Sequence, residues 1–393
     1  MLVPIQRLAL LVVAFTIPFP IRVNSVAIIL ATVLCVGPAL QIKTLKALVL
    51  SPLFILIMAH ALILVVGLTY SPDINQGFAD IERFALAVAL LILTFSMRQS
   101  EVTIVQLVSM LALGCATIIV YGFFAVIFQD ESARRNALTL GHVYFTDKIG
   151  IHPAYLTLYL SFIFFFIIEI LKQGTGSSQK YRIYFISALA AILVLVLFLR
   201  SQMGMIVFML MSVMYVFTHF KQRAAMVVFF LTSVALIVYL VDDQRVHTFF
   251  DSYGKNVSSA LDHRKQIWEG AMTGIGEAPV FGAGTGGEQT ALNNAFAEIG
   301  FNEGIEKSYN AHNQYLSFML RNGAVELICF LGLLFYCFRI ALPRPNRSFL
   351  IFLMIFALTI TTESCLNVQK GIVFFYLFIG AWSYMKEEQP KTN

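Results

Sequence analysis

The chain has 393 residues, of which 59% are apolar and only 12% are charged. Soluble domains usually carry about 25% charged residues, so a folded core cannot absorb this much apolar surface, and an ordinary soluble protein is excluded. The net charge of +5 falls mostly in short loops between apolar segments, where basic residues set membrane topology. It is therefore not a sign of nucleic-acid binding. The composition predicts an all-α polytopic membrane protein.

A helix that crosses a bilayer needs about 20 predominantly apolar residues. By this length criterion the apolar segments predict about twelve transmembrane helices. In chain order they cover residues 6–21, 24–41, 47–69, 80–97, 102–128, 152–171, 182–200, 203–220, 224–241, 314–340, 347–362 and 370–386.

Basic residues are concentrated in alternate short loops, as at Lys43, Arg98 and Lys172, whereas the loop from Ser71 to Glu82 is acidic. Loops rich in Lys and Arg stay in the cytoplasm. The outer loop at residues 129–151 also carries basic residues and departs from this pattern. The charge distribution predicts that both termini lie in the cytoplasm and that the long polar segment before residue 312 lies outside.

This topology divides the chain into three parts. Residues 1–241 are expected to form a transmembrane bundle of about nine spans, and residues 242–311 one large, partly helical outer loop. Residues 312–393 are expected to form the C-terminal transmembrane helices and a cytoplasmic tail. The five cysteines lie in or beside apolar segments without metal-ligand spacing, so neither a disulfide framework nor a metal site is predicted.

Five ionisable residues are expected at the outer membrane surface, although they are spread from residue 152 to residue 363. They are His152, Arg200, Arg264, His312 and Glu363. Each has an ordinary explanation when taken alone: an arginine can extend its head group to the interface, a histidine can start a helix, and a glutamate can be a solvated interfacial group. Their convergence on one surface nevertheless points to a reaction centre there.

The outer loop has structure of its own. Helical spacing predicts a helix from Leu261 to Met272, with Arg264 and Trp268 four residues apart on one face. The glycine-rich stretch after Pro279 predicts an irregular turn. Because it lacks the lysine of a nucleotide-binding loop and does not follow a buried strand, no nucleotide site is predicted.

These residues resemble the motifs of a family of bacterial envelope glycosyltransferases, the O-antigen ligase and O-antigen polymerase superfamily. The matching elements, in chain order, are the Arg of LRSQMG at the outer end of a mid-chain span, Arg264, Trp268 and Ala271 of the loop helix, PVFGAG from Pro279 to Gly284, and HNQYL from His312 to Leu316 followed by Gly323. Their order and expected side of the membrane match over residues 152–385, while the earlier spans match only as generic membrane helices.

The resemblance implies a glycan-transferring enzyme of the ligase or polymerase type, two classes that share these motifs, and of the two we favour an O-antigen ligase. Such an enzyme transfers O-antigen polysaccharide from undecaprenyl pyrophosphate to the lipid A–core oligosaccharide, on the periplasmic face of the bacterial inner membrane, during lipopolysaccharide biosynthesis. It further implies an inverting transfer that needs no metal and no other cofactor. The implied partners are the lipid-linked donor, the lipid A–core acceptor and membrane lipids.

Three residues are expected to be catalytic. A departing lipid pyrophosphate is anionic, and guanidinium groups bind phosphate oxygens in bidentate fashion, so we assign Arg200 and Arg264 to the leaving group. The acceptor hydroxyl must lose a proton, and His312 is the expected base because the positive end of a helix favours a neutral imidazole. His263, next to Arg264, is an alternative base.

A second set of residues is expected to bind substrate: His152, Tyr155, Trp268, Asn313, Tyr315 and Glu363. His152 and Tyr155 are expected to position the donor or the acceptor, and Glu363 to orient a histidine or a sugar hydroxyl. The aromatic side chains either stack on sugar rings or belong to an interfacial aromatic belt.

Two alternatives stay open. One is an O-antigen polymerase that extends lipid-linked repeat units, which the smaller outer loop at residues 129–151 supports. The other is a transporter of lipid-linked glycans, for which His60 is the clearest ionisable residue within a span. A ligase is favoured over a polymerase because the chain is compact, carries the motif set above and has one dominant outer loop. An enzyme is favoured over a transporter because the polar residues gather at one surface.

Overall fold

The computed structural model describes residues 2–39, 42–98, 102–128, 141–172, 179–199, 201–219, 263–343 and 347–385. All regular elements in these ranges are helices, which confirms the all-α prediction for them. They are α1 (Leu2–Thr16), α2 (Ile21–Ala39), α3 (Ile42–Val49), α4 (Pro52–Leu68), α5 (Ile74–Ser96), α6 (Ile104–Ile127), α8 (Gly141–Ile149), α9 (Pro153–Lys172), α10 (Gln179–Leu199), α11 (Gln202–His219), α14 (Glu288–Glu298), α15 (Asn302–Glu306), α16 (Gln314–Ala341), α17 (Ser348–Thr359), the 3-10 helix η1 (Cys365–Asn367) and α18 (Gln369–Tyr384). A further helix covers residues 263–277.

Many of these helices are suited to a membrane. Four are long and apolar enough to cross one, namely Ile104–Ile127, Pro153–Lys172, Arg182–Leu199 and Gln314–Ala341. Shorter apolar helices lie at Pro4–Thr16, Ile21–Cys35, Pro52–Leu68, Met203–Tyr215 and Ser348–Thr359. A helix lies at every expected span except 224–241, which falls outside the described residues together with the outer loop up to residue 262. The chain is a multi-pass membrane protein.

The helix starts follow local sequence signals. Pro52 opens α4 after Ser51, whose hydroxyl accepts the N–H of Phe54. Asp73 caps α5, and Thr103 caps α6 in a reciprocal pair with Gln106. Side chains of this kind satisfy the free N–H groups of the first turn, so the connections between apolar helices can be short.

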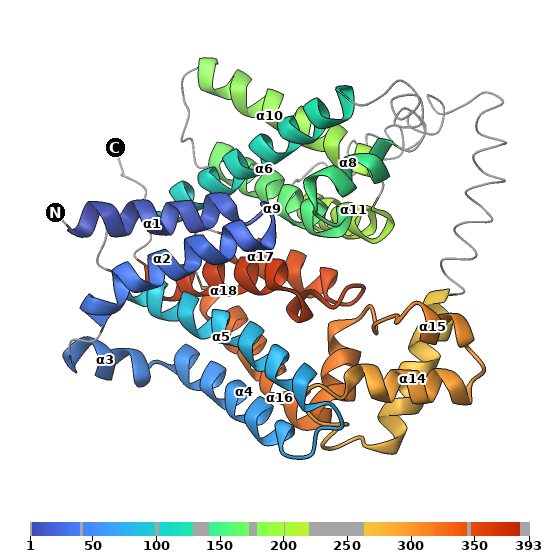
Figure 1. The fold of residues 1–393 in the computed structure, drawn as a ribbon. Coiled ribbons are helices and arrows are strands. Elements are labelled where there is room, and N and C mark those ends of the chain that lie inside the picture. Colours follow the sequence, from blue (N-terminus) through green and yellow to red (C-terminus); the bar gives the residue numbers. More distant parts are fainter. Residues whose placement is uncertain are drawn as a thin grey trace, which may run out of the picture.

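The C-terminal helix α18 lies at the centre of the bundle (Figure 1). Every residue from Gln369 to Trp382 is buried, and α18 packs along α5. Around it, α1 packs on α2 and α6, α9 on α10 and α17, and α4 on α16. The centre is aromatic, with Phe162 of α9, Phe352 of α17 and Trp382 of α18 in mutual contact.

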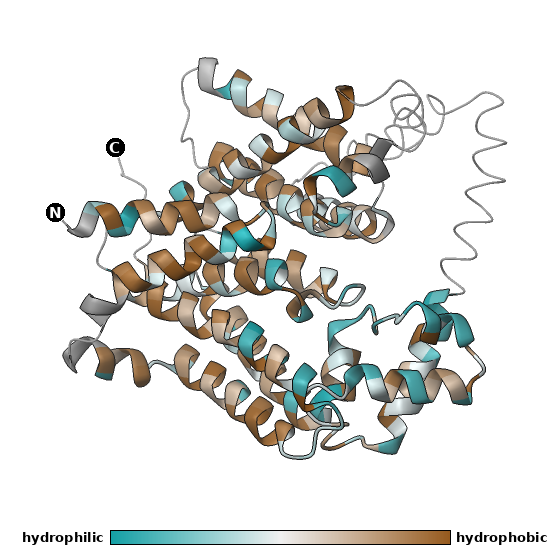
Figure 2. Cartoon of the chain, in the orientation of Figure 1, coloured by the Kyte–Doolittle hydropathy of each residue, from teal (hydrophilic) through white to brown (hydrophobic). Residues whose placement is uncertain are grey.

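Polar residues gather at one end of the bundle, in the layer formed by residues 263–311 (Figure 2). This layer has a separate apolar core, in which Ile267 and Ala271 contact Leu292 and Phe296. Residues 263–311 thus form a small helical layer that packs over the end of the bundle.

The glycine-rich turn after Pro279 has a structural role. Helix α16 is broken at Gly323, where φ is 66° and ψ is −160°. The turn fills the break: the N–H of Gly284 donates to the carbonyl of Arg321 at 2.7 Å, and the N–H of Ala324 donates to the carbonyl of Pro279 at 3.0 Å. The turn is therefore held in α16 by backbone hydrogen bonds.

We expect Gly323→Ala to destabilise the protein. A Cβ at this position would lie 2.3 Å from the carbonyl of Val280, and side chains rarely adopt this backbone conformation, so a loss of about 1–3 kcal/mol is expected. The measurement is the thermal midpoint of the detergent-solubilised protein. The matched control is Gly332→Ala in the same helix, where the added Cβ meets no atom within 4 Å. Equal thermal midpoints for the two variants would contradict the close packing of the glycine-rich turn in the break of α16.

A buried ion cluster lies beside this break. Arg321 donates to both carboxylate oxygens of Glu326, whose Oε1 is 2.8 Å from Nε2 of His60. Asn322 donates to Glu326 Oε2 at 3.0 Å and to Thr285 at 3.1 Å. Charged side chains inside a membrane protein need such partners. His60 therefore joins α4 to α16 through Glu326.

Candidate active site

Three side chains from distant segments meet where the polar layer contacts the bundle. Arg264 comes from the helix over residues 263–277, His312 precedes α16, and Glu363 lies in the turn after α17. Glu363 is the common partner, because it pairs with Arg264 through one oxygen and with His312 through the other. The structure thus brings together three of the residues expected at the outer surface.

Arg264 is anchored at two points. Its Nη1 donates to the carbonyl oxygen of Thr362 at 2.8 Å, and its Nη2 donates to Oε1 of Glu363 at 3.3 Å. The side chain is mostly buried. A guanidinium group has five N–H donors in a fixed plane, so these two bonds orient Arg264 and leave other donors for an anionic ligand.

His312 has an unusual backbone conformation. Its φ is 43°, a left-handed value that non-glycine residues rarely adopt and that often occurs at functional sites. Its N–H donates to Asn310 Oδ1 at 2.9 Å, and its Nδ1 lies 3.4 Å from Oε2 of Glu363. Within the described residues Nε2 has no hydrogen-bond partner, so it is the ring nitrogen that can accept a proton from a substrate.

The charges around Glu363 keep it ionised. Burial by itself would raise the pKa of this carboxyl group, but the hydrogen bond with His312 and the positive charges of His312 and Arg264 outweigh it and hold the pKa below its usual range. His152, just before α9, is close enough to feel the same groups. Burial, with His312 and Arg264, lowers the pKa of His152 despite the opposite effect of Glu363, so His152 is neutral at pH 7.

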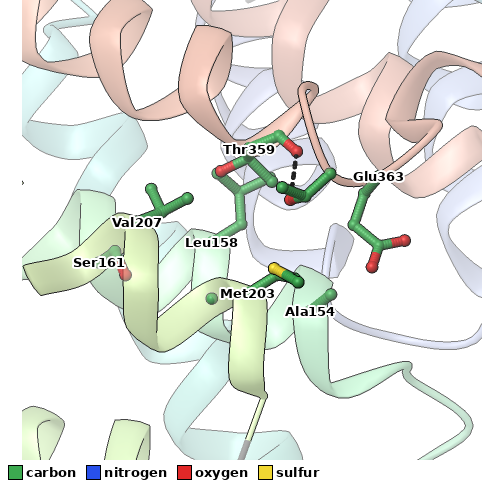
Figure 3. A pocket seen from close by; sticks show the side chains of 9 residues that line it. Ala154, Leu158, Ser161, Met203, Val207, Thr359 and Glu363 are labelled. Carbon is green, nitrogen blue, oxygen red and sulfur yellow. Dashed lines mark hydrogen bonds between the residues drawn. The ribbon is translucent and has the colours of Figure 1, made fainter. Parts of the chain in front are cut away.

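A narrow pocket lies beside Glu363, between α9, α11 and the end of α17 (Figure 3). It is lined by Ala154, Leu158, Ser161, Met203, Gly204, Val207, Thr359, Thr362 and Glu363. The hydroxyls of Ser161 and Thr359 donate to carbonyls of their own helices. The pocket therefore presents a mainly apolar surface next to a charged group.

Residues 186–331 match the family model described as O-antigen ligase. These residues are similar to an O-antigen ligase domain. Members of this family are membrane enzymes that transfer glycans, of the ligase or polymerase type, and the predicted resemblance is confirmed. Arg264 and His312 lie inside the matched range, whereas His152 and Glu363 lie outside it. No curated protein matches the chain.

Gln314, the first residue of α16 and part of this O-antigen ligase-like domain, joins the two segments that carry the His312–Glu363 pair. Its backbone N–H donates to the carbonyl of Ile360 at 2.9 Å. Its side-chain oxygen accepts the N–H of Leu366 at 2.6 Å, and its side-chain nitrogen donates to Asn367 at 3.0 Å. Gln314 is fully buried. Its contacts fix the start of α16 against the turn that follows α17.

We expect Gln314→Ala to lower the rate of glycan transfer by about 10–100-fold without removing the protein from the membrane. The loss of two buried hydrogen bonds, each worth about 1–3 kcal/mol when its partner is left unpaired, releases the turn that holds Glu363. Gln314→Glu retains the acceptor for Leu366 and is expected to lose less. Steady-state transfer rates of purified variants measure the effect, and a normal rate for Gln314→Ala would contradict it.

A second buried contact joins α14 of the same domain to the site. Glu288 Oε2 accepts from Ser317 at 2.6 Å and from Asn367 at 2.9 Å. Burial raises the pKa of Glu288 above its usual range, although both hydrogen bonds and Arg321 act against it. Sequence reasoning did not single out Ser317 or Asn367. The sequence signal for Asn367 was the polar stretch TTESCLNVQ, which lies between two apolar helices.

The other residues expected to bind substrate have these places. Asn313 caps α16, with its Oδ1 accepting from the N–H groups of Tyr315 and Leu316. The hydroxyl of Tyr315 donates to Ala357 on α17 at 3.3 Å. Tyr155 is buried in α9, with its ring 6.4 Å from that of His152. Asn313 and Tyr315 therefore hold α16, and Tyr155 lies beside His152, next to the His312–Glu363–Arg264 cluster.

Trp268 packs on the apolar core of the polar layer. Its indole N–H is buried and, within the described residues, has no hydrogen-bond partner. His263, the alternative base, has Nε2 3.1 Å from Glu303 and belongs to a separate ion cluster with Lys307. Arg200 lies outside the described residues. In the part of the chain that the structure describes, no group of three or more His, Cys, Asp or Glu side chains is arranged to hold a metal ion.

Proposed function

We propose that the protein is an O-antigen ligase, which transfers O-antigen polysaccharide from undecaprenyl pyrophosphate to the lipid A–core oligosaccharide. The observation that carries this proposal is the His312–Glu363–Arg264 cluster, two members of which lie in the O-antigen ligase-like domain. It combines a base, a carboxylate that orients it and a cation for an anionic leaving group.

The transfer is a single displacement. The acceptor hydroxyl oxygen attacks the anomeric carbon of the donor sugar, and its proton passes to Nε2 of His312. The bond between the anomeric carbon and the pyrophosphate oxygen breaks, and its electron pair leaves with the pyrophosphate. Attack from the face opposite to the leaving group inverts the anomeric configuration.

Glu363 supports the base in two ways. Its Oε2, 3.4 Å from Nδ1 of His312, favours the tautomer with the proton on Nδ1 and leaves the Nε2 lone pair for the acceptor. Once Nε2 has taken the proton, the ionised carboxylate stabilises the imidazolium. Arg264 and Arg200 then stabilise the charge that develops on the pyrophosphate.

The proposal includes a topology. About twelve spans, both termini in the cytoplasm of the bacterial inner membrane, and residues 242–311 in the periplasm would place the cluster on the periplasmic face. It also includes the division into a bundle at residues 1–241, the loop, and the C-terminal spans at residues 312–393. The polar layer at one end of the bundle supports this arrangement.

Two alternatives are distinguished by experiment. A polymerase would use the same cluster on a lipid-linked acceptor. A transporter would need a mobile ionisable residue in the bundle, but His60 is held by Glu326 in a buried cluster, which favours an enzyme.

The decisive experiment is a gel of lipopolysaccharide from a strain that lacks the gene. Loss of a ligase leaves lipid A–core without O-antigen, while the polymer stays on undecaprenyl pyrophosphate. Loss of a polymerase leaves core that carries a single repeat unit, which would overturn the ligase assignment. Reconstitution with purified donor and acceptor separates transfer from transport, because transfer needs no gradient.

We expect transfer by the reconstituted protein to survive EDTA, because the proposed leaving-group cations are arginines. The measurement is the transfer rate before and after chelation. Loss of activity that a divalent cation restores would contradict a metal-independent reaction.

A further inference from the structure

The turn that fills the break in α16 carries two large apolar side chains on the surface. Val280 is 51% exposed and Phe281 64% exposed. Elsewhere on the same segment the exposed positions include the charged Lys265, Glu269 and Glu277, and Met272 is the other large apolar side chain that is exposed there. Two adjacent exposed apolar side chains at the tip of a polar segment suggest an apolar partner.

The neighbours of this turn are the outward faces of two bundle helices. On one side, the N–H of Val325 donates to the carbonyl of Val280 at 3.3 Å. Val325 begins an exposed stripe on α16 that continues through Ile328, Leu331 and Phe335, spaced three or four residues apart on one helix face. The turn thus extends this stripe at the point where α16 is broken.

On the other side, the hydroxyl of Tyr70 donates to the carbonyl of Phe281 at 2.8 Å. Tyr70 follows α4, whose exposed surface near this end is also apolar, at Leu62, Val65 and Val66. Exposed apolar faces of membrane-spanning helices contact lipid. The Val280–Phe281 turn lies between two such faces and continues both of them.

The length of α16 gives the depth of the turn. The exposed Leu342 lies just past the far end of the helix, 17 residues after Val325 (342 − 325). At about 1.5 Å per residue this is roughly 26 Å, against a hydrocarbon thickness of about 30 Å. With Leu342 at one boundary of the hydrocarbon core, Val280 lies just inside the opposite boundary, within the last few ångströms of the core.

We propose that the Val280–Phe281 turn is inserted into the membrane leaflet next to the polar layer and contacts lipid acyl chains there. Phe281 lies at the depth where aromatic side chains anchor proteins to the interface. The insertion holds the end of the helix over residues 263–277 against the bilayer and so sets the height of Arg264 above it. It does not depend on which glycan is transferred.

Site-directed spin labelling in vesicles of phosphatidylethanolamine and phosphatidylglycerol tests this. The label is placed by Phe281→Cys in a Cys329→Ala background, because the other four cysteines are buried. Collision of the nitroxide with oxygen, which concentrates in lipid, is compared with collision with a water-soluble nickel chelate. Ile328→Cys is the lipid reference, and Ala297→Cys, on an exposed position of α14, is the water reference.

The expected result is a several-fold higher ratio of oxygen to nickel collisions at position 281 than at position 297, close to the ratio at 328. Val280→Cys provides a second label at the same depth, in case the first variant is poorly folded. Ratios at 280 and 281 that equal the ratio at 297 would overturn the insertion.

Discussion

Replacing His312 with alanine is expected to abolish glycan transfer while the protein stays folded in the membrane. A positioned general base contributes about 10²–10⁴-fold to a rate, and Nε2 of His312 is the ring nitrogen free to take the acceptor proton. Transfer is measured with purified donor and acceptor, and membrane content by immunoblot.

The matched control is His263→Ala. His263 lies beside Arg264 in the chain, but its Nε2 pairs with Glu303, away from the cluster. We expect this variant to transfer glycan at a nearly normal rate. The reverse pattern, with His263 essential and His312 dispensable, would assign the base to His263.

The same prediction extends to Glu363 and to pH. The pKa of Glu363 is held below its usual range. The carboxylate is therefore ionised at any pH above its usual pKa. It stops supporting His312 only when the pH falls through the lowered pKa. Between about pH 5 and 8 it is ionised throughout. Glu363→Gln should therefore reduce the rate across this whole window. A reduction confined to one end of the window would contradict this role.

The helices were predictable because they depend on local patterns of apolar residues, whereas the side of the membrane on which the cluster lies stays a prediction. Runs of apolar residues predict spans, and loop charges give their direction. The convergence of Arg264, His312 and Glu363 followed from topology alone. Asn313 was expected to bind substrate, whereas in the structure its side chain caps α16, the role that an amide directly before a helix commonly has.

The pairings within the cluster were not predictable. The two oxygens of Glu363 bind different partners because α16, α17 and the loop helix approach with a particular register, which depends on packing between distant segments. The break in α16 at Gly323 was not predictable for a similar reason. The apolar pattern continues through it, and only the docked turn with Gly284 satisfies the freed backbone groups.

Arg264→Ala is expected to reduce transfer as severely as the loss of His312, and Arg264→Lys to restore only part of the rate. One ammonium group cannot reproduce a planar fork that contacts Thr362, Glu363 and a phosphate oxygen together. Lys265→Ala, which removes the exposed neighbouring cation, is the control and should transfer normally. Full activity of Arg264→Lys would refute the bidentate role.

A double-mutant cycle separates the two roles that Arg264 can have. If it acts only by holding Glu363, then Arg264→Ala should add nothing once Glu363→Ala has removed that contact. If it also stabilises the departing pyrophosphate, the double variant should lose further activity, mainly in kcat, because that charge develops only in the transition state. We expect the second outcome, since the two anchoring bonds leave guanidinium donors for the leaving group. If the double variant loses no further activity, Arg264 is a positioning residue only, and Arg200 remains as the leaving-group cation.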